Sequence, residues 1–448
     1  MKRAVIFLLA ALLTLTLTGA VSAETGGLFE YRILEDGSAM ITGYRGSGAE
    51  LAFPETLEGH PVSGLSAGFG FNTPAAADLR SISIPKTMTT VEPGALRFAE
   101  FLTEIRIPED HPSLRFADGA LYNTEEQSLL LYLQSSKAEA FEVPEGVREL
   151  ADSAFYRAGL ASVSLPGSLE RIGRDCFNQC VRMKEILLPD SLRSIGADAF
   201  TNCDRLKTIR ISAGVTDIEE GAFTDNHLTE ILTDPDNPVF TVTGGALINA
   251  REGTLIAYPA YAEAESFAIP EGVKRIGRLA FYRAHHLKQI TFPEGLLEIG
   301  GSAFISCNHL AAIELPDSLV LLEEAAFRIN SDTERLRLPA GLTEIRDNFD
   351  DMNIAELVIP EGVTRIERSF VSLGNLTEAV IPGSVIAIGP RAFTYCKNLR
   401  SITIPASVTE IGTTFAGCSE ELVIRVEAGS YAEQFCRERQ LRYEILSE

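Results

Sequence analysis

The chain has 448 residues, with 62 acidic against 39 basic side chains and a formal net charge of −23 at pH 7. This charge repels the phosphate backbone of nucleic acids and the headgroups of anionic lipids, so both are poor candidates as partners, and basic or neutral partners remain open. The simplest interpretation of the acidity is that it keeps an elongated exported protein soluble.

The first 23 residues have the pattern of a signal peptide. Lys2 and Arg3 precede an apolar run from Ala4 to Leu17, and small residues follow up to Ala23. The run is too short to be a good membrane span, and the pattern predicts cleavage after Ala23. We therefore expect a secreted or cell-surface protein that has no membrane span once the signal peptide is removed.

Most of the remaining chain aligns with itself at a period of about 23 residues, with the pattern L-x-x-I-x-I-P-x-x-V-x-x-I-G-x-x-A-F-x-x-C. The I-x-I step predicts a short strand, which the proline ends because it has no N–H to donate to a ladder. The V-x-x-I-G step predicts a return through an extended or tight helical segment, and Ala and Phe fill the interior. One repeat cannot offset the entropy of ordering its backbone, so the pattern predicts a solenoid of stacked repeats.

The cysteines follow the same period. Five of the seven lie three residues after the repeat phenylalanine, namely Cys180, Cys203, Cys307, Cys396 and Cys418. A residue tied to one repeat position is usually a small buried core element, so we interpret them as free structural thiols. The alternative is a disulfide between neighbouring repeats, such as Cys180 with Cys203 or Cys396 with Cys418.

Two insertions, near residues 109–140 and 235–266, interrupt the array and resemble each other. Each places a Gly-Ala-Leu turn between alternating strands and continues into an L-L-x-Y or L-I-x-Y strand. We expect hairpins that project from the solenoid. If the chain binds a partner, exposed aromatic side chains on these hairpins are candidates for the contact: Tyr122, Tyr132, Tyr258 and Tyr261.

One segment matches a catalytic motif. Gly64 to Gly68 fits the G-x-S-x-G pattern that exposes a nucleophilic serine in hydrolases. Ser66 lies within the register of a repeat, however, and no histidine and acid follow in a setting that would complete a triad. We therefore predict no catalytic residues.

Metal ligands are the second chemical possibility. His286 and His309 should stack on adjacent repeats beside His285, where a transition metal is conceivable, but solvated loop residues are the simpler interpretation. Acidic clusters also occur, and they lack the ligand spacing of known calcium loops; they comprise Asp347, Asp350 and Asp351, and Asp234 with Asp236. We predict no metal and no cofactor. The array is also degraded in places, since Ser212 replaces the repeat proline and residues 347–353 have lost the repeat Gly, Ala and Cys, so local irregularity is expected there.

The repeat pattern resembles that of the BspA-like (Treponema pallidum-type) family of bacterial leucine-rich repeat proteins, over nearly all of the chain after residue 23. The resemblance implies a leucine-rich-repeat solenoid of the α/β horseshoe class, predominantly β with short strands and few helices, built from right-handed repeats of about 23 residues. It also implies an N-terminal cap at residues 24–65, with a hairpin turning at Asp36 and Gly37, and an array at 66–420. A C-terminal cap at 421–448 would contain a helix around residues 430–439.

Members of this family are surface proteins that engage other proteins. The resemblance therefore implies a non-catalytic extracellular binding or adhesion module whose partner is a host extracellular protein or a bacterial surface protein. The alternative is a structural or spacer protein of the cell envelope or matrix, with no specific ligand. The sequence names neither the binding residues nor the oligomeric state.

Overall fold

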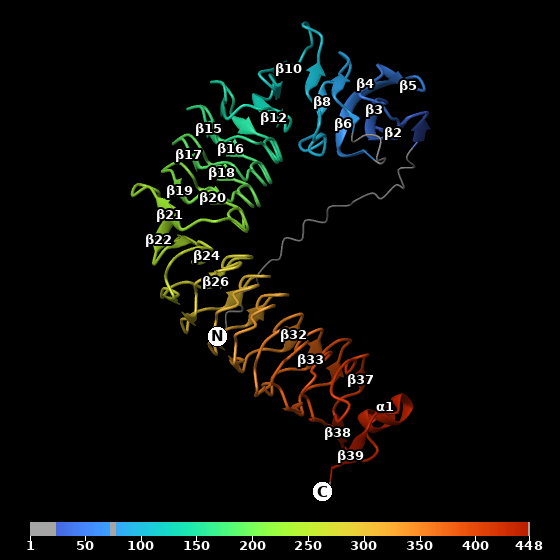
Figure 1. The fold of residues 1–448 in the computed structure, drawn as a ribbon, viewed down its shortest axis with the longest axis vertical. Coiled ribbons are helices and arrows are strands. Elements are labelled where there is room, and N and C mark those ends of the chain that lie inside the picture. Colours follow the sequence, from blue (N-terminus) through green and yellow to red (C-terminus); the bar gives the residue numbers. More distant parts are fainter. Residues whose placement is uncertain (1–23, 72–77, 447–448) are drawn as a thin grey trace, which may run out of the picture.

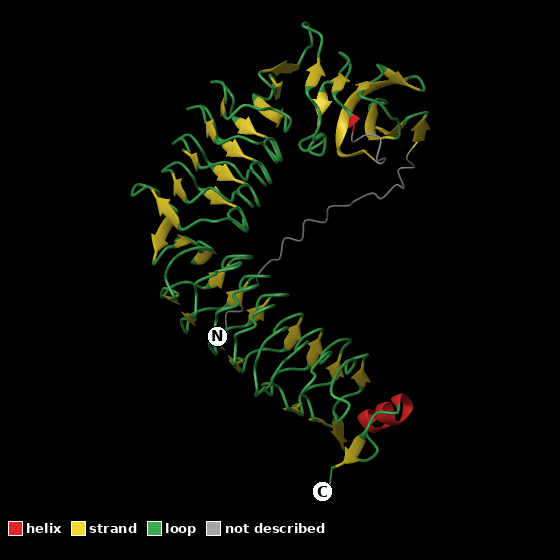
Figure 2. Cartoon of the chain, in the orientation of Figure 1, coloured by secondary structure: helices red, strands yellow, loops and turns green. Residues whose placement is uncertain are grey.

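A long curved solenoid forms the molecule, with each repeat stacked on the next (Figure 1). The computed structural model describes residues 24–71 and 78–446, so the predicted signal peptide, residues 1–23, lies outside the described residues. Short strands and loops dominate, and the described part contains one α-helix, α1 (Tyr431–Arg439) (Figure 2). The predicted leucine-rich-repeat solenoid, with short strands and few helices, is confirmed.

In most repeats the I-x-I step forms a strand that pairs in parallel with the same step of a neighbouring repeat, as Val163 does with Ile186, and these strands fall into several separate short sheets. The middle residue of the strand is buried and its two neighbours are exposed in β9 and β27. We call these strands the first ladder. They are β4 (Glu50–Ala52), β7 (Ser81–Ser83), β9 (Glu104–Arg106), β13 (Ala140–Glu142), β15 (Ser162–Ser164), β17 (Glu185–Ile186), β19 (Thr208–Ile211), β21 (Glu230–Thr233), β25 (Ser266–Ala268), β27 (Gln289–Thr291), β29 (Ala312–Glu314), β31 (Arg335–Arg337), β34 (Glu378–Val380), β36 (Ser401–Ile404), β38 (Val423–Val426) and β39 (Tyr443–Ile445).

The V-x-x-I-G step is extended rather than helical, and its strands form a second parallel ladder in which Ile172 pairs with Ile195. Between the two ladders the repeat proline begins a tight turn, because its carbonyl accepts a hydrogen bond from the residue three positions later, as from Leu169 N to Pro166 O at 3.2 Å. The second ladder comprises β8 (Thr90–Val91), β14 (Glu149–Leu150), β16 (Arg171–Ile172), β18 (Ser194–Ile195), β20 (Asp217–Ile218), β26 (Arg275–Ile276), β28 (Glu298–Ile299), β30 (Leu321–Leu322), β32 (Glu344–Arg346), β33 (Arg365–Glu367), β35 (Ala387–Ile388) and β37 (Glu410–Ile411).

Stacked turns form the third side of each repeat. Alternate N–H groups, those of Asp175, Phe177 and Gln179, donate to carbonyls of the next repeat at 2.8–3.0 Å. Asp175 and Gln179 adopt left-handed backbone conformations, with φ of 54° and 64°. This alternation points every second N–H group toward the neighbouring repeat. Hydrogen bonds therefore join the turns along the stack, as they join the strands.

Aromatic rings stack along the interior behind these turns. Tyr132, Phe155, Phe177, Phe200 and Phe223 follow one another with ring centroids 5.1–5.7 Å apart. A second stack has centroids 4.7–6.4 Å apart and contains Tyr258, Phe281, Phe304, Phe327, Phe349, Phe370, Phe393 and Phe415. The second insertion separates the two stacks.

The cysteines are free, as the first interpretation of their spacing predicts. Cys203 and Cys307 are fully buried, and each thiol donates to the phenylalanine carbonyl of the preceding repeat, at 3.2 Å to Phe177 O and 3.0 Å to Phe281 O. Asn330 takes the same position in its repeat, where its amide donates to Phe304 O at 3.1 Å. The repeat position therefore selects a small buried donor.

The two insertions do not project from the solenoid, so this prediction was wrong. Their strands pair antiparallel, but β12 and β24 then pair in parallel with β14 and β26 and so continue the second ladder. All residues of the inner strands are buried, because both faces of these strands carry side chains that pack in the core. The insertion strands are β10 (Leu114–Ala117), β11 (Ala120–Asn123), β12 (Ser128–Tyr132), β22 (Phe240–Thr243), β23 (Ala246–Asn249) and β24 (Thr254–Ala257).

Distinct elements close the two ends of the arc (Figure 1). At the N-terminal end, β2 and β3 pair antiparallel around a turn in which Gly37 N donates to Leu34 O at 3.0 Å, as predicted. The strands here are β1 (Glu24–Gly26), β2 (Phe29–Ile33), β3 (Ala39–Tyr44), β5 (Thr56–Leu57) and β6 (His60–Phe71). At the other end α1 starts after its N-cap Ser430 and packs against β37 and β38, in agreement with the predicted helix. The residue limits of the caps and the array stay predictions.

Candidate functional site

Three large apolar side chains lie exposed on neighbouring repeats of the second ladder. Leu297, Val320 and Leu321, which we call the leucine patch, are 41%, 63% and 43% exposed. The preceding repeat carries Lys274 and Arg275 at the equivalent positions, and the following repeat carries Thr343 and Glu344. The patch is therefore a local departure from a polar surface, of the kind that marks interaction sites.

A cavity of about 580 Å³ adjoins the leucine patch, where the second ladder is interrupted because β30 ends one sheet and β32 begins another. In the repeat of Phe304, a Cβ added at Gly300 would lie 2.6 Å from Arg278 N, so this corner packs closely on the preceding repeat. The next repeat has Glu323 in place of that glycine, and its carboxylate accepts a hydrogen bond from Gly301 N at 2.7 Å. The turns of these two repeats nevertheless stay hydrogen-bonded, since Ser302 N donates to Glu324 O at 3.1 Å, so the cavity accompanies the break between β30 and β32 rather than a wider spacing of these turns.

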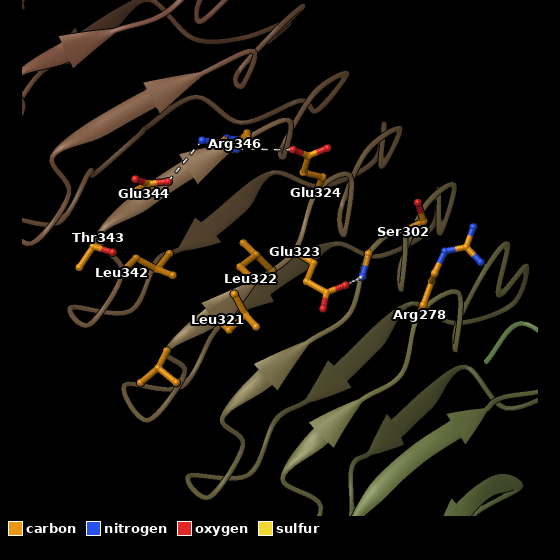
Figure 3. A pocket seen from close by; sticks show the side chains of 12 residues that line it. Arg278, Ser302, Leu321, Leu322, Glu323, Glu324, Leu342, Thr343, Glu344 and Arg346 are labelled. Carbon is orange, nitrogen blue, oxygen red and sulfur yellow. Dashed lines mark hydrogen bonds and ion pairs between the residues drawn. The ribbon is translucent and has the colours of Figure 1, made fainter. Parts of the chain in front are cut away.

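Charged groups surround the apolar wall of this cavity (Figure 3). Leu321, Leu322 and Leu342 line one part of it. On the rim, the Arg346 guanidinium lies 3.5 Å from the Glu344 carboxylate and 3.9 Å from that of Glu324. An apolar centre within a polar rim is the arrangement found at protein–protein interfaces, where it accepts an apolar anchor from the partner.

A similar substitution elsewhere gives a different lining. Glu219 also replaces the repeat glycine, and its carboxylate accepts from Ala197 N at 3.1 Å. The cavity there, about 420 Å³, is lined by Arg174, Arg275 and Arg278 and has no leucine cluster. Only the cavity beside the leucine patch, among these two, offers an apolar anchor site.

A second exposed cluster, the aromatic patch, lies on the turns of the first repeats. Phe98 and Phe101 are exposed, and Phe98 packs edge-on against Tyr156 with ring centroids 6.1 Å apart. Arg97 lies over the Phe98 ring at 4.6 Å and Arg80 over that of Phe101 at 4.8 Å. Aromatic and arginine side chains are the types enriched at binding hot spots.

The aromatic candidates predicted from the insertions are in the wrong place. Tyr122, Tyr132 and Tyr258 are buried, and the last two begin the two aromatic stacks. Tyr261 is half-buried, with its ring 4.4 Å from that of His227 and 4.5 Å from that of His285. The signal that was missed is the run of Leu297, Val320 and Leu321 at repeat positions that carry Lys274 and Arg275 in the repeat before and Thr343 and Glu344 in the repeat after.

The residues considered for catalysis have structural partners. The Ser66 hydroxyl is nearly buried in β6 and donates to the Glu92 carboxylate at 3.1 Å. Glu92 also accepts from Ala67 N at 2.7 Å, so the serine belongs to the contacts that join two repeats. This geometry fits a repeat position rather than a nucleophile.

The structure does not bring the metal candidates together as a ligand set. His309 lies 3.1 Å from the Asp332 carboxylate, and burial lowers the pKa of His285, further lowered by Arg283 and neighbouring histidines. Over residues 24–71 and 78–446, no group of three or more His, Cys, Asp or Glu side chains is arranged to hold a metal ion. In the same ranges, no helix is long and apolar enough to cross a membrane.

Comparisons with known proteins agree with the repeat pattern. A family model described as "BspA type Leucine rich repeat region (6 copies)" matches residues 131–240, 257–372 and 367–430. No curated protein matches the chain.

Several solved structures resemble this chain in fold. A leucine-rich repeat protein from Eubacterium ventriosum aligns with a TM-score of 0.54 at 19% identity, covering 88% of this chain and 93% of that one, and this likeness supports the fold alone. A leucine rich cell surface protein from Faecalibacterium prausnitzii aligns with a TM-score of 0.44 at 22% identity, covering 92% and 96%. A leucine-rich repeat protein from Bacteroides ovatus gives a TM-score of 0.45 at 22% identity, covering 95% and 100%.

Proposed function

We propose, since the chain belongs to the BspA type leucine-rich repeat family, that it is a secreted, non-catalytic module that binds a protein at the leucine patch. The partner is a host extracellular protein or a bacterial surface protein that presents an apolar side chain to the cavity beside Leu321. The observation that carries the proposal is the exposure of Leu297, Val320 and Leu321 on neighbouring repeats of a ladder whose surface is otherwise largely polar.

Leaving these apolar side chains in water costs free energy. Burial of one exposed valine or leucine side chain contributes about 1.5–3 kcal/mol. The solenoid fold does not require the exposure, because Lys274 and Arg275 occupy the equivalent positions one repeat earlier, where β26 pairs in parallel with β28. A bound partner that covers the patch recovers this free energy.

The test is a binding screen of the purified protein against extracellular-matrix proteins, mucin and bacterial surface fractions, each repeated at high salt. The double variant Val320→Thr/Leu321→Glu gives the repeat the residues of its neighbour and preserves its register. Leu187→Glu removes an 83%-exposed leucine from the first ladder and serves as the matched control.

We expect saturable binding that survives high salt, because apolar burial is not screened. We also expect the double variant to weaken binding at least about tenfold, as the loss of one buried apolar anchor does, and the control to leave it unchanged. Folded protein that binds none of the three fractions would instead favour a structural or spacer role. Binding that the double variant leaves intact would move the site away from the leucine patch.

A further inference from the structure

Two neighbouring repeats near the C-terminal end have shortened turns. One residue fewer separates Ile345 from Phe349, and Ile366 from Phe370, than separates Ile299 from Phe304. The phenylalanine rings of the shortened repeats stay in the stack, with centroids 5.9 Å apart. Because the stack holds the interior end of each turn in place, a shorter turn reaches less far outward.

The repeats of Phe327 and Phe393, on either side, keep turns of full length. A recess of about 580 Å³ lies at these turns, and its lining extends to Thr413 and Ala416 of the next repeat, whose turn from Ile411 to Phe415 is also one residue shorter. We call it the arginine recess, and the side chains that matter for its chemistry are Arg328, Asp347, Asp350, Arg368, Arg391 and Tyr395.

The arginines of the recess are unequally paired. Arg328 lies 3.8 Å from the Asp347 carboxylate and 3.4 Å from that of Asp350. In the described part of the chain, the exposed side chains of Arg368 and Arg391 form no ion pair or hydrogen bond. Three guanidinium groups thus face two carboxylates, in a protein whose net charge is −23. The two unpaired guanidinium groups favour an anion.

A carboxylate lies at the base of the recess. Asp350 is 4% exposed, and its Oδ1 accepts a hydrogen bond from Val371 N at 3.0 Å. Its Oδ2 has only the long contact with Arg328 Nε, so it retains capacity to accept a hydrogen bond from a ligand. Asp347 and Asp350 together disfavour a multiply charged phosphate, whereas they suit a ligand that carries hydroxyl groups beside one negative charge.

An aromatic ring forms one side of the recess. Tyr395 is 56% exposed, and a Cβ added at Gly417 would lie 2.3 Å from its Cδ1, so the ring rests against the glycine backbone. This support holds the ring as a platform with part of its surface in solvent. The C–H groups of a pyranose ring pack against an aromatic surface of this kind.

We propose that the arginine recess binds an acidic sugar, a pyranose with one carboxylate. Arg368 and Arg391 bind the carboxylate, Tyr395 packs against the ring, and Asp350 accepts a hydroxyl donor. This site is separate from the leucine patch and does not depend on the proposed protein binding.

The experiment is isothermal titration calorimetry of the purified full chain with two acidic probes, 3′-sialyllactose and trigalacturonate. Lactose is the neutral control, and tetra-aspartate is the acidic control without a sugar ring. The variants are Arg368→Gln, Arg391→Gln and Tyr395→Ala, all at exposed positions. Arg400→Gln is the matched control, since it removes an exposed arginine of the same array outside the recess.

We expect at least one acidic probe to bind and lactose not to bind. Each of the three recess variants should weaken that binding about tenfold or more, as the loss of a charge-assisted contact does, and Arg400→Gln should not change it. Several results would overturn the proposal: no binding of either probe to folded protein, equal binding of lactose, equal binding of tetra-aspartate, or affinities that the recess variants leave unchanged.

Discussion

The stacked phenylalanines are the residues on which the solenoid depends most. Phe304 is fully buried between Phe281 and Phe327, with ring centroids 4.7 and 4.8 Å away. Phe304→Ala should lower the free energy of unfolding by roughly 3–5 kcal/mol, because it leaves a cavity in a rigid stack. The measurement is the urea midpoint, with Leu187→Ala as an exposed control expected within about 0.5 kcal/mol of the parent. An unchanged midpoint for Phe304→Ala would refute the repeat register.

Asp350 makes the stability of its repeats depend on pH. Burial raises the pKa of this carboxyl from 3.8 to about 7, as do Asp347 and Asp351, against the opposing effects of Val371 N–H and Arg328. The folded protein therefore binds the proton more tightly than the unfolded chain. The resulting stabilisation is complete below about pH 4 and is lost as the pH rises through 7.

Asp350→Asn keeps the shape of the side chain without the charge. The variant's gain in free energy of unfolding over the parent should be larger at pH 8 than at pH 5 by roughly 1–3 kcal/mol. Urea unfolding at the two pH values measures the difference, and the exposed substitution Asp236→Asn is the control. Equal effects of Asp350→Asn at both pH values would show that the carboxyl does not titrate in this range.

At the scale of elements, most repeats add one strand to each ladder and one turn to the third side, and small changes in a turn accompany surface features. Glutamate in place of the repeat glycine accompanies the cavities at Glu219 and Glu323, and a turn one residue shorter accompanies the arginine recess. The second ladder is interrupted after β20 and after β30, the strands that precede Glu219 and Glu323, whereas β32, β33 and β35 stay paired beside the arginine recess. Variation in the turns therefore changes the surface while the core pattern is retained.

The C-terminal helix α1 depends on its first turn. The Ser430 hydroxyl accepts a hydrogen bond from Glu433 N at 3.2 Å, and the Glu433 carboxylate accepts one from Gly429 N at 2.7 Å. Ser430→Ala should cost about 1 kcal/mol and speed hydrogen exchange at the first amides of α1. The control is Ser331→Ala, which removes a hydroxyl outside the helix and should leave hydrogen exchange in α1 unchanged. If Ser430→Ala also leaves this exchange unchanged, the helix is held by packing alone.

On the scale of the whole molecule, the buried apolar side chains form three clusters rather than one. The first runs from Tyr31 to Ala151, the second from Ala120 to Ala257 and the third from Ala246 to Cys436. Their limits fall in the two insertions, where the aromatic stacks also begin. Because contacts in a solenoid are made between neighbouring repeats, each cluster is expected to behave as a cooperative unit.

This arrangement predicts stepwise unfolding. In hydrogen exchange followed by mass spectrometry at intermediate urea, Phe304→Ala should speed exchange throughout the third cluster and leave peptides of residues 155–223 close to the parent. A uniform increase along the chain would indicate one cooperative unit. The parent protein at the same urea concentrations is the reference.

The repeat period, the two strands of each repeat, the phenylalanine stack and the buried cysteine position could be predicted from the sequence. Each of these features recurs many times along the chain. The local preferences for a strand at I-x-I, a turn at the proline and a small buried donor three residues after the phenylalanine all agree with the stacking of repeats. The exposed aromatic residues expected on the insertions could not be predicted correctly. A strand with apolar residues on both faces is stable only if it is covered on both, and its neighbours come from other repeats.

The candidate sites were decided by tertiary structure. The leucine patch joins Leu297 to Val320 and Leu321, and the arginine recess joins Arg328 to Arg368 and Arg391, so the groups of each site come from different repeats. Such residues become neighbours only after the repeats stack. The cavity at the break of the second ladder and the recess at the shortened turns both depend on how closely neighbouring repeats approach in space. The sequence by itself determined the repeating interior, because that interior follows from a local pattern, whereas the surface features arise from contacts between turns that only the assembled solenoid brings together.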